Sequence, residues 1–180
     1  MDNKKSGFSL VETLVVISIV GILSIIGMGT YFQVSRDGRN TKRKSDLKEL
    51  QLALEEFKKV NNNRYPQTFI TNRSNDSYWG TCSDFGSHDL TGANGYIPGL
   101  APEFVNSLPI DPRDGQDNTE NDSSCLGETA CYVYVSDGID YKLIANCTPE
   151  GNIPGKDPFF DPTRHLYSYA IWSSDQSRTW

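Results

Sequence analysis

Glu12 is a single carboxylate within the otherwise apolar run GFSLVETLVVISIVGILSIIG, which extends from Gly7 to Gly27. An ionised carboxylate is costly in hydrocarbon unless a cation neutralises it or it reaches the membrane surface. The chemistry that this residue offers is therefore ion pairing with a nearby cation. The other interpretation is that Glu12 lies at the membrane interface, where a charge near the end of a span costs little.

A second group of carboxylates lies in the segment DPRDGQDNTEND. Clustered carboxylates suit calcium, which takes about six to eight oxygen ligands. The spacing differs from the alternating acidic pattern of a helix-loop-helix calcium site, and a solvated acidic loop is the alternative. The candidate calcium ligands are Asp111, Asp114, Asp117 and Asp122, with Glu120 between them.

Cysteine could supply either disulfides or a metal site. The chain has four cysteines, Cys82, Cys125, Cys131 and Cys147, and an even number in an oxidising compartment predicts two disulfides. Of the three possible connectivities we favour Cys131 with Cys147 and Cys82 with Cys125, because the first pair flanks a predicted hairpin. Zinc needs closely spaced ligand pairs, and gaps of 42, 5 and 15 residues supply none.

Motifs for catalysis are missing from the sequence. The two histidines, His88 and His165, have no metal-pair spacing, and no serine nucleophile motif or phosphate-binding glycine loop is present. We therefore predict that the protein is not an enzyme and that calcium is its one candidate cofactor.

The elements that must position these residues begin with a membrane span. Thr13 to Ser35 are 23 consecutive uncharged residues, and about 20 apolar residues cross a bilayer. Lys4 and Lys5 precede the run, and a short basic flank stays in the cytoplasm, so the chain after Ser35 faces outward. A cleavable secretory signal has a shorter apolar core and a small-residue exit, which this run lacks.

The next segment, residues 36–60, has the pattern of an amphipathic helix. Its apolar stripe consists of Leu47, Leu50, Leu54 and Phe57, with Ala53 and Val60 beside them. Asn61 to Asn63 are a stop signal, because asparagine tolerates the left-handed conformation that ends helices. Residues 8–60 are therefore predicted to form one nearly continuous helix.

Residues 61–180 have the pattern of a small sheet-containing head with long loops. Cys131 to Cys147 read as two strands around an Asp137-Gly138 turn, and Tyr167 to Ser174 as a third strand. An antiparallel sheet must cover the apolar stripe of the helix, which predicts an α+β fold.

Charge is divided unevenly along the chain. Residues 36–59 hold eight Lys or Arg and five Asp or Glu, whereas residues 61–180 hold seven and sixteen. An acidic head disfavours nucleic acid, so no direct nucleic-acid binding is predicted. The basic stretch RDGRNTKRKSDLK could contact lipid headgroups, pair with acidic groups of an adjacent copy, or remain solvated.

The opening residues, MDNKKSGFSLVETLVVISIVGIL, resemble the class III signal of type IV pilins and type II secretion pseudopilins. The resemblance rests on a short basic leader that ends in glycine, a Gly7-Phe8 junction, Glu12 at the fifth position after it, and the apolar span. It covers about the first 66 residues, and LPIDPRDG, 108–115, is similar to a stretch of major pseudopilins. Those proteins have Trp-Gly where this chain has Arg113-Asp114.

The resemblance implies the type IV pilin fold and a division into a leader peptide (1–7), a transmembrane and assembly half-helix (8–35), an amphipathic half-helix (36–60) and an extracellular head (61–180). It implies that a prepilin peptidase cuts after Gly7 and that Phe8 is then N-methylated. Glu12 would pair with the amine of a neighbouring subunit, and some similar pseudopilins bind calcium in the head.

The implied function is that of a structural subunit of an extracellular pilus-like filament or a periplasmic pseudopilus. Its implied partners are copies of itself, other pilins, the peptidase, an assembly platform protein and an ATPase, with the inner membrane as its location before assembly. The alternative is a non-polymerising, membrane-tethered extracellular binding or adhesion protein, with or without calcium in its head.

Overall fold

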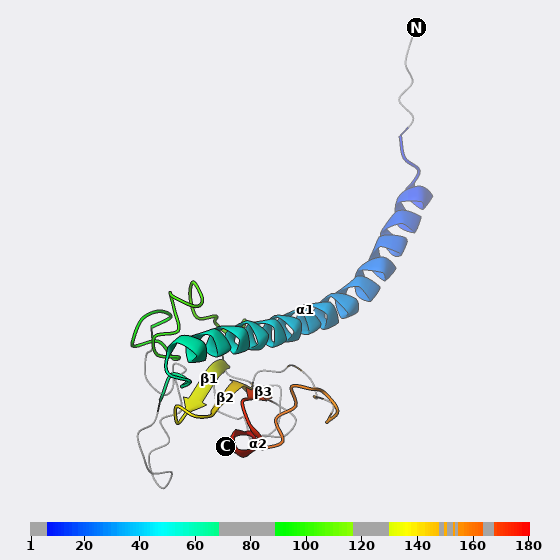
Figure 1. Cartoon of the computed structure of the whole chain (residues 1–180). Helices are drawn as coiled ribbons and strands as arrows, with labels where there is room; N and C mark the ends of the chain where they lie inside the picture. Colours follow the sequence, from blue (N-terminus) through cyan, green and yellow to red (C-terminus); the bar gives the residue numbers. More distant parts are fainter. Residues whose placement is uncertain are drawn as a thin grey trace. The chain divides into compact units, whose positions relative to one another are not determined.

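The computed structural model describes residues 7–68, 89–116, 130–147, 150, 153, 155–163 and 168–180, without the side chains of residues 26–29. Contacts divide the chain into two compact units, Met1–Gly38 and Arg39–Trp180. The order of elements is α1 (Leu10–Val60), β1 (Cys131–Ser136), β2 (Tyr141–Asn146), β3 (Tyr169–Trp172) and α2 (Asp175–Arg178) (Figure 1). The prediction of an α+β fold with one long N-terminal helix is confirmed.

The helix α1 ends where the asparagine signal predicts. Asn62 and Asn63 have φ values of 54° and 60°, in the left-handed region. The Asn63 N–H donates to the Lys58 carbonyl over 3.1 Å, which satisfies one of the carbonyls left open at a helix end. The chain then turns back along the sheet, and the Tyr65 N–H donates to the Gly138 carbonyl over 3.0 Å.

The three strands form one antiparallel sheet in the order β1-β2-β3. Both predicted hairpin strands are present, joined by residues 137–140. The Asp137 carboxylate accepts the N–H groups of Ile139 and Asp140, both over 2.8 Å, and Gly138 has a φ of 89°. The side chain of Asp137 therefore holds the turn that the Asp-Gly pair predicted.

The core of the second unit lies between α1 and one face of the sheet. Leu47, Leu50 and Leu54 of α1 are fully buried, while Phe57 is half-buried and meets Phe104 edge-on. From the sheet, Tyr132, Tyr134, Tyr141, Leu143 and Ala145 join the same cluster. The expected stripe is confirmed except for Val60, which is exposed because it is the last helical residue.

The opposite face of the sheet is buried as well, which the alternating pattern did not predict. Cys131, Val133, Ile144 and Ala170 form a smaller cluster there, with Trp172 against it. The four-residue helix α2 was also not predicted. The Ser174 hydroxyl caps it by accepting the Ser177 N–H, and the Ser177 hydroxyl in turn accepts the Ser174 N–H.

Lys142 of β2 places a charge in this core. Its side chain and that of Asp161 are fully buried and lie 2.9 Å apart, Nζ to Oδ1. The Lys142 ammonium also donates to the carbonyls of Arg178 and Trp180, over 3.0 and 2.8 Å. These bonds connect α2 to the sheet.

We expect Asp161→Ala to lower the free energy of unfolding by about 3–5 kcal/mol, because it removes the Asp161 carboxylate from the buried Lys142 ammonium. The double variant Lys142→Met with Asp161→Asn should lose less, since the buried ammonium is removed together with the Asp161 charge. Urea unfolding of the full chain in detergent measures both. Lys59→Ala, which breaks the exposed Lys59–Glu56 pair, is the control and should change stability by less than about 1 kcal/mol. A double variant less stable than Asp161→Ala would contradict this account.

Candidate functional site

The bond between Gly7 and Phe8 lies in irregular, exposed chain before the helix. Residues 7–9 have no regular structure, and the Phe8 side chain is 85% exposed. A Cβ added at Gly7 would meet nothing within 4 Å. No packing contact with the described residues therefore requires a glycine at this position, and Gly7 and Phe8 themselves are exposed.

Glu12 lies in the first turn of α1 and caps its N-terminus. Its Oε2 accepts the Ser9 N–H over 2.8 Å, and the Ser9 carbonyl accepts the Thr13 N–H over 3.1 Å. A glutamate three residues after a serine N-cap is half of a capping box. The position of Glu12 in an apolar run predicts ion pairing and does not identify Ser9 as a cap, although the Ser-x-x-Glu signal is visible in the sequence. The positive end of the helix dipole also stabilises a carboxylate at this position.

The first half of α1 exposes apolar side chains on all sides. Large apolar residues from Leu10 to Ile25 are more than 45% exposed, as are Tyr31, Phe32 and Val34. The serine hydroxyls are satisfied inside the helix, because Ser18 donates to the Leu14 carbonyl over 2.8 Å and Ser24 to the Val20 carbonyl over 2.7 Å. By length and composition α1 can cross a membrane. It presents lipid or a neighbouring helix with a surface that has no unpaired hydroxyls among these residues.

Two arginines of the basic stretch pair with carboxylates of the head of the same chain, which none of the three interpretations predicted. Arg43 is fully buried and forms a bidentate pair with the fully buried Asp111, with Nε to Oδ2 at 2.7 Å and Nη2 to Oδ1 at 3.0 Å. Arg39 makes a second bidentate pair with Glu150, whose backbone carbonyl also accepts from Asn40. The head of the same chain, not lipid, solvent or another copy, therefore neutralises these arginines.

Three more charged residues of this stretch, Lys42, Lys44 and Asp46, are paired. Lys44 pairs with Asp157 at 2.5 Å and lies 4.9 Å from the centroid of the Tyr169 ring. Asp46, almost fully buried, accepts from the Tyr132 hydroxyl over 2.8 Å and from Lys42 one helical turn earlier. Basic residues of the segment 36–59 therefore pair with acidic residues of the segment 61–180 within one molecule.

Asp111, the first of the predicted calcium ligands, is already engaged by an arginine. Asp111 uses both carboxylate oxygens on Arg43, and Oδ1 also accepts the Arg113 N–H over 2.8 Å. The pKa of Asp114 is raised, mainly by partial desolvation and to a lesser extent by the charge of Asp111. Asp117, Glu120 and Asp122 lie outside the described residues, and the described part of the chain contains no group of three metal-ligating side chains. Calcium binding stays a prediction, with Asp111 unsuited to it.

Of the four cysteines, only Cys131 and Cys147 lie among the described residues. Cys131 and Cys147 are disulfide-bonded and no cysteine among the described residues is free, whereas Cys82 and Cys125 lie outside them. The β1-β2 register places Cys131 opposite Asn146, one residue before Cys147. The pairing of Cys131 with Cys147 stays a prediction. His88 and His165 also lie outside the described residues.

The geometry defines a class of protein: an α+β head whose own long helix continues into a segment able to span a membrane, preceded by an accessible Gly-Phe bond. Residues 2–28 match the model of the prokaryotic N-terminal methylation motif, which is the class III signal of type IV pilins and pseudopilins. The chain is thus similar to substrates of prepilin peptidase over its first 28 residues. No curated protein and no solved structure gives a significant match.

The Arg39–Glu150 pair predicts a dependence of stability on pH. Burial raises the pKa of Glu150, but the hydrogen bond and charge of Arg39, helped by Arg113 and Arg43, outweigh it and hold that pKa below its ordinary value. A carboxyl group whose pKa is lowered on folding adds stability above its unfolded pKa and loses that stability as the pH falls through the folded pKa.

We therefore expect the urea midpoint of the full chain to fall as the pH drops from about 5 to about 3. Glu150→Gln should lower the midpoint at neutral pH, and the difference from the unsubstituted chain should shrink as the solution is acidified. Parallel pH curves for the two chains would show that Glu150 gains nothing from its arginine partners.

Proposed function

We propose that this chain is a prepilin: a structural subunit that is inserted in the inner membrane, cut after Gly7, methylated at Phe8 and assembled through its N-terminal helix into a filament. The observation that carries the proposal is the methylation motif at residues 2–28, continuous with a helix whose first half has exposed apolar side chains all round. Such a surface is stable in lipid first and against the helices of other subunits afterwards.

Glu12 supports assembly through the position of its carboxylate. The bond that it makes with the Ser9 N–H brings it next to the residue that becomes the N-terminus after cleavage. Cleavage creates an ammonium group at Phe8, and a carboxylate and an ammonium attract each other strongly where water is excluded. Pairing with the amine of a neighbouring subunit would neutralise both charges in the filament core and define the axial register.

The partners that follow are prepilin peptidase, copies of this chain and other pilins, a platform protein and an assembly ATPase. The final location would be the cell surface, or the periplasm for a pseudopilus. An enzymatic role has no support from the described site, and the Arg43–Asp111 and Arg39–Glu150 pairs serve to hold the head on the helix.

The mass of the protein isolated from native membranes or sheared filaments tests the processing step. We expect a chain that begins at N-methylated Phe8, because the Gly7-Phe8 bond is accessible in the structure. Gly7→Leu should retain the leader, since the glycine serves the peptidase rather than the fold. A wild-type chain that still begins at Met1 in cells with active prepilin peptidase would refute the proposal and favour the tethered binding protein.

Two substitutions at Glu12 separate its charge from its cap. Glu12→Gln keeps an oxygen that can accept the Ser9 N–H but removes the charge, whereas Glu12→Ala removes both. We expect both variants to insert in the membrane and to lose incorporation into filaments by about tenfold or more, since a buried unpaired ammonium is left. Quantitative blotting of sheared filaments against membranes measures the ratio. Normal incorporation of Glu12→Gln would show that the charge of Glu12 does not drive assembly.

A further inference from the structure

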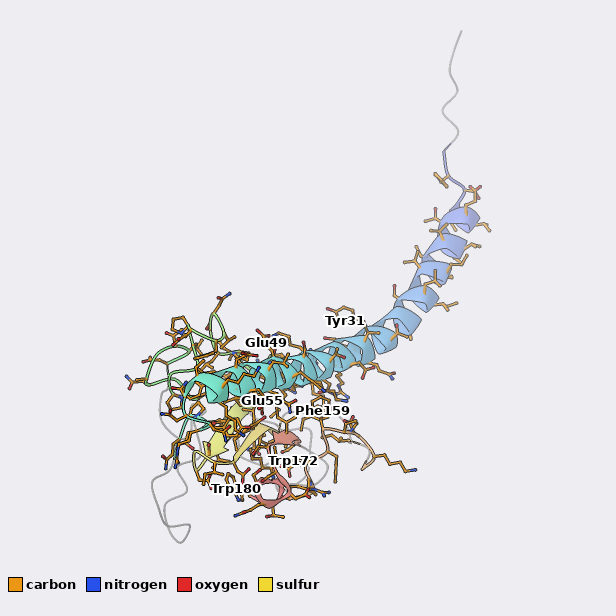
Figure 2. All side chains as sticks on the ribbon, in the orientation of Figure 1. Tyr31, Glu49, Glu55, Phe159, Trp172 and Trp180 are labelled. Atoms are coloured by element: carbon orange, nitrogen blue, oxygen red, sulfur yellow. The ribbon has the colours of Figure 1, made fainter. Side chains whose placement is uncertain are left out.

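A cavity of about 200 Å³ lies beside the edge strand β3, in the unit Arg39–Trp180. Lys48 and Gln51 of α1, the Pro158-Phe159 loop, and Ala170 to Trp172 of β3 line it. The positions of Phe159 and Trp172 below the helix can be followed in Figure 2. The lining combines apolar and aromatic side chains with the ammonium group of Lys48 and the amide of Gln51.

The cavity exists because a neighbouring segment stops pairing with β3. Phe160 forms a bridge with Tyr169, and the Ala170 N–H donates to the Phe159 carbonyl over 2.8 Å. The Phe159 N–H, however, donates to the Asp157 carboxylate, and Pro158 has no N–H to offer. Pairing therefore ends at Phe159, and the outer edge of Ile171 and Trp172 borders the cavity.

Two cationic side chains lie near aromatic rings that line this cavity: Lys48, which is itself a lining residue, and Arg178, which lies over Trp172. Lys48 Nζ lies 5.7 Å from the centroid of the Phe159 ring, and the Arg178 guanidinium lies 5.5 Å from that of Trp172. Among the described residues, Lys48 forms no ion pair of the kind that engages Lys44 with Asp157. An occupant with an apolar centre and flanking carboxylates would complement these groups.

A surface of this kind, an exposed leucine between two glutamates, lies on the helix α1 itself. Leu52 is 70% exposed and has Glu49 three residues before it and Glu56 four residues after it, so the three side chains share one helical face. Glu49 lies on the opposite side of α1 from Phe159 and Trp172 (Figure 2). Glu56 pairs with Lys59, but both side chains are more than 60% exposed, so little is lost if that pair opens.

We propose that the β3 cavity receives the Leu52 ridge, Glu49-Leu52-Glu56, of a second copy of this chain. Leu52 would enter between Phe159 and Trp172, while Glu49 and Glu56 meet Lys48 and Arg178. Cavity and ridge are different surfaces of one subunit, so the contact is heterologous and repeats without closing unless the rotation happens to form a ring. This inference rests on the proposed filament, to which it adds the contact between heads.

Zero-length carbodiimide cross-linking of filaments from mixed ¹⁴N- and ¹⁵N-labelled cells tests the contact in the full chain. The reagent joins a lysine amine to a carboxylate in direct contact. We expect mixed-isotope peptides that join Lys48 of one copy to Glu49 or Glu56 of another. Intact filaments that yield cross-links elsewhere, but none between these residues of different copies, would overturn the proposal.

Charge reversal provides a second test. Lys48→Glu and Glu49→Lys should each lower filament yield by about tenfold or more, because each places like charges opposite one another in the contact. The double variant should recover most of the yield, since the pair is restored with its signs exchanged. Glu103→Lys is the control, because Glu103 is equally an exposed acid but lies outside both surfaces.

The outcomes separate this inference from the function on which it rests. Filaments that assemble normally from both single variants overturn the head contact and leave the prepilin proposal intact. A wild-type chain that is never processed or assembled overturns both. Loss in the single variants without recovery in the double variant would also overturn the proposed pairing.

Discussion

The helix α1 must satisfy two different surroundings, and this constraint governs the rest of the molecule. In the unit Arg39–Trp180, Leu47, Leu50 and Leu54 are fully buried against the sheet and loops of the head. In the unit Met1–Gly38, the large apolar residues from Leu10 to Ile25 are exposed in the part of the chain that the structure describes. Burying an apolar side chain of this size is worth about 1.5–3 kcal/mol, so the second set needs lipid or other subunits.

The contact between helix and head depends on charge as much as on apolar packing. Buried arginine and carboxylate groups are costly to desolvate, and they are tolerated here because the pairs are bidentate and carry further hydrogen bonds. Such pairs require one geometry, whereas an apolar stripe permits sliding. We infer that Arg43–Asp111 and Arg39–Glu150 define the register of the helix on the head, while the leucines supply most of the stabilisation.

Several local features followed from the sequence because short-range physics decides them. The asparagine stop, the Asp-Gly turn and the leucine stripe were predicted from residues close together in the chain, and each is present. Long-range pairs were not predicted. Asp111 was read as a calcium ligand, yet Arg43, 68 residues earlier, holds its carboxylate. Residue types alone do not say which of many arginines and carboxylates will meet.

The sequence by itself determined the α+β class, the membrane-competent helix and the methylation motif, because period, length and local motif are properties of neighbouring residues. Only the tertiary structure decided that Arg39, Arg43 and Lys44 pair with carboxylates of the head, that both faces of the sheet are buried, and that a cavity with Lys48 among its lining residues opens beside β3. Those features depend on where distant segments come to lie, and a cavity or a buried ion pair exists only once the chain has folded around it.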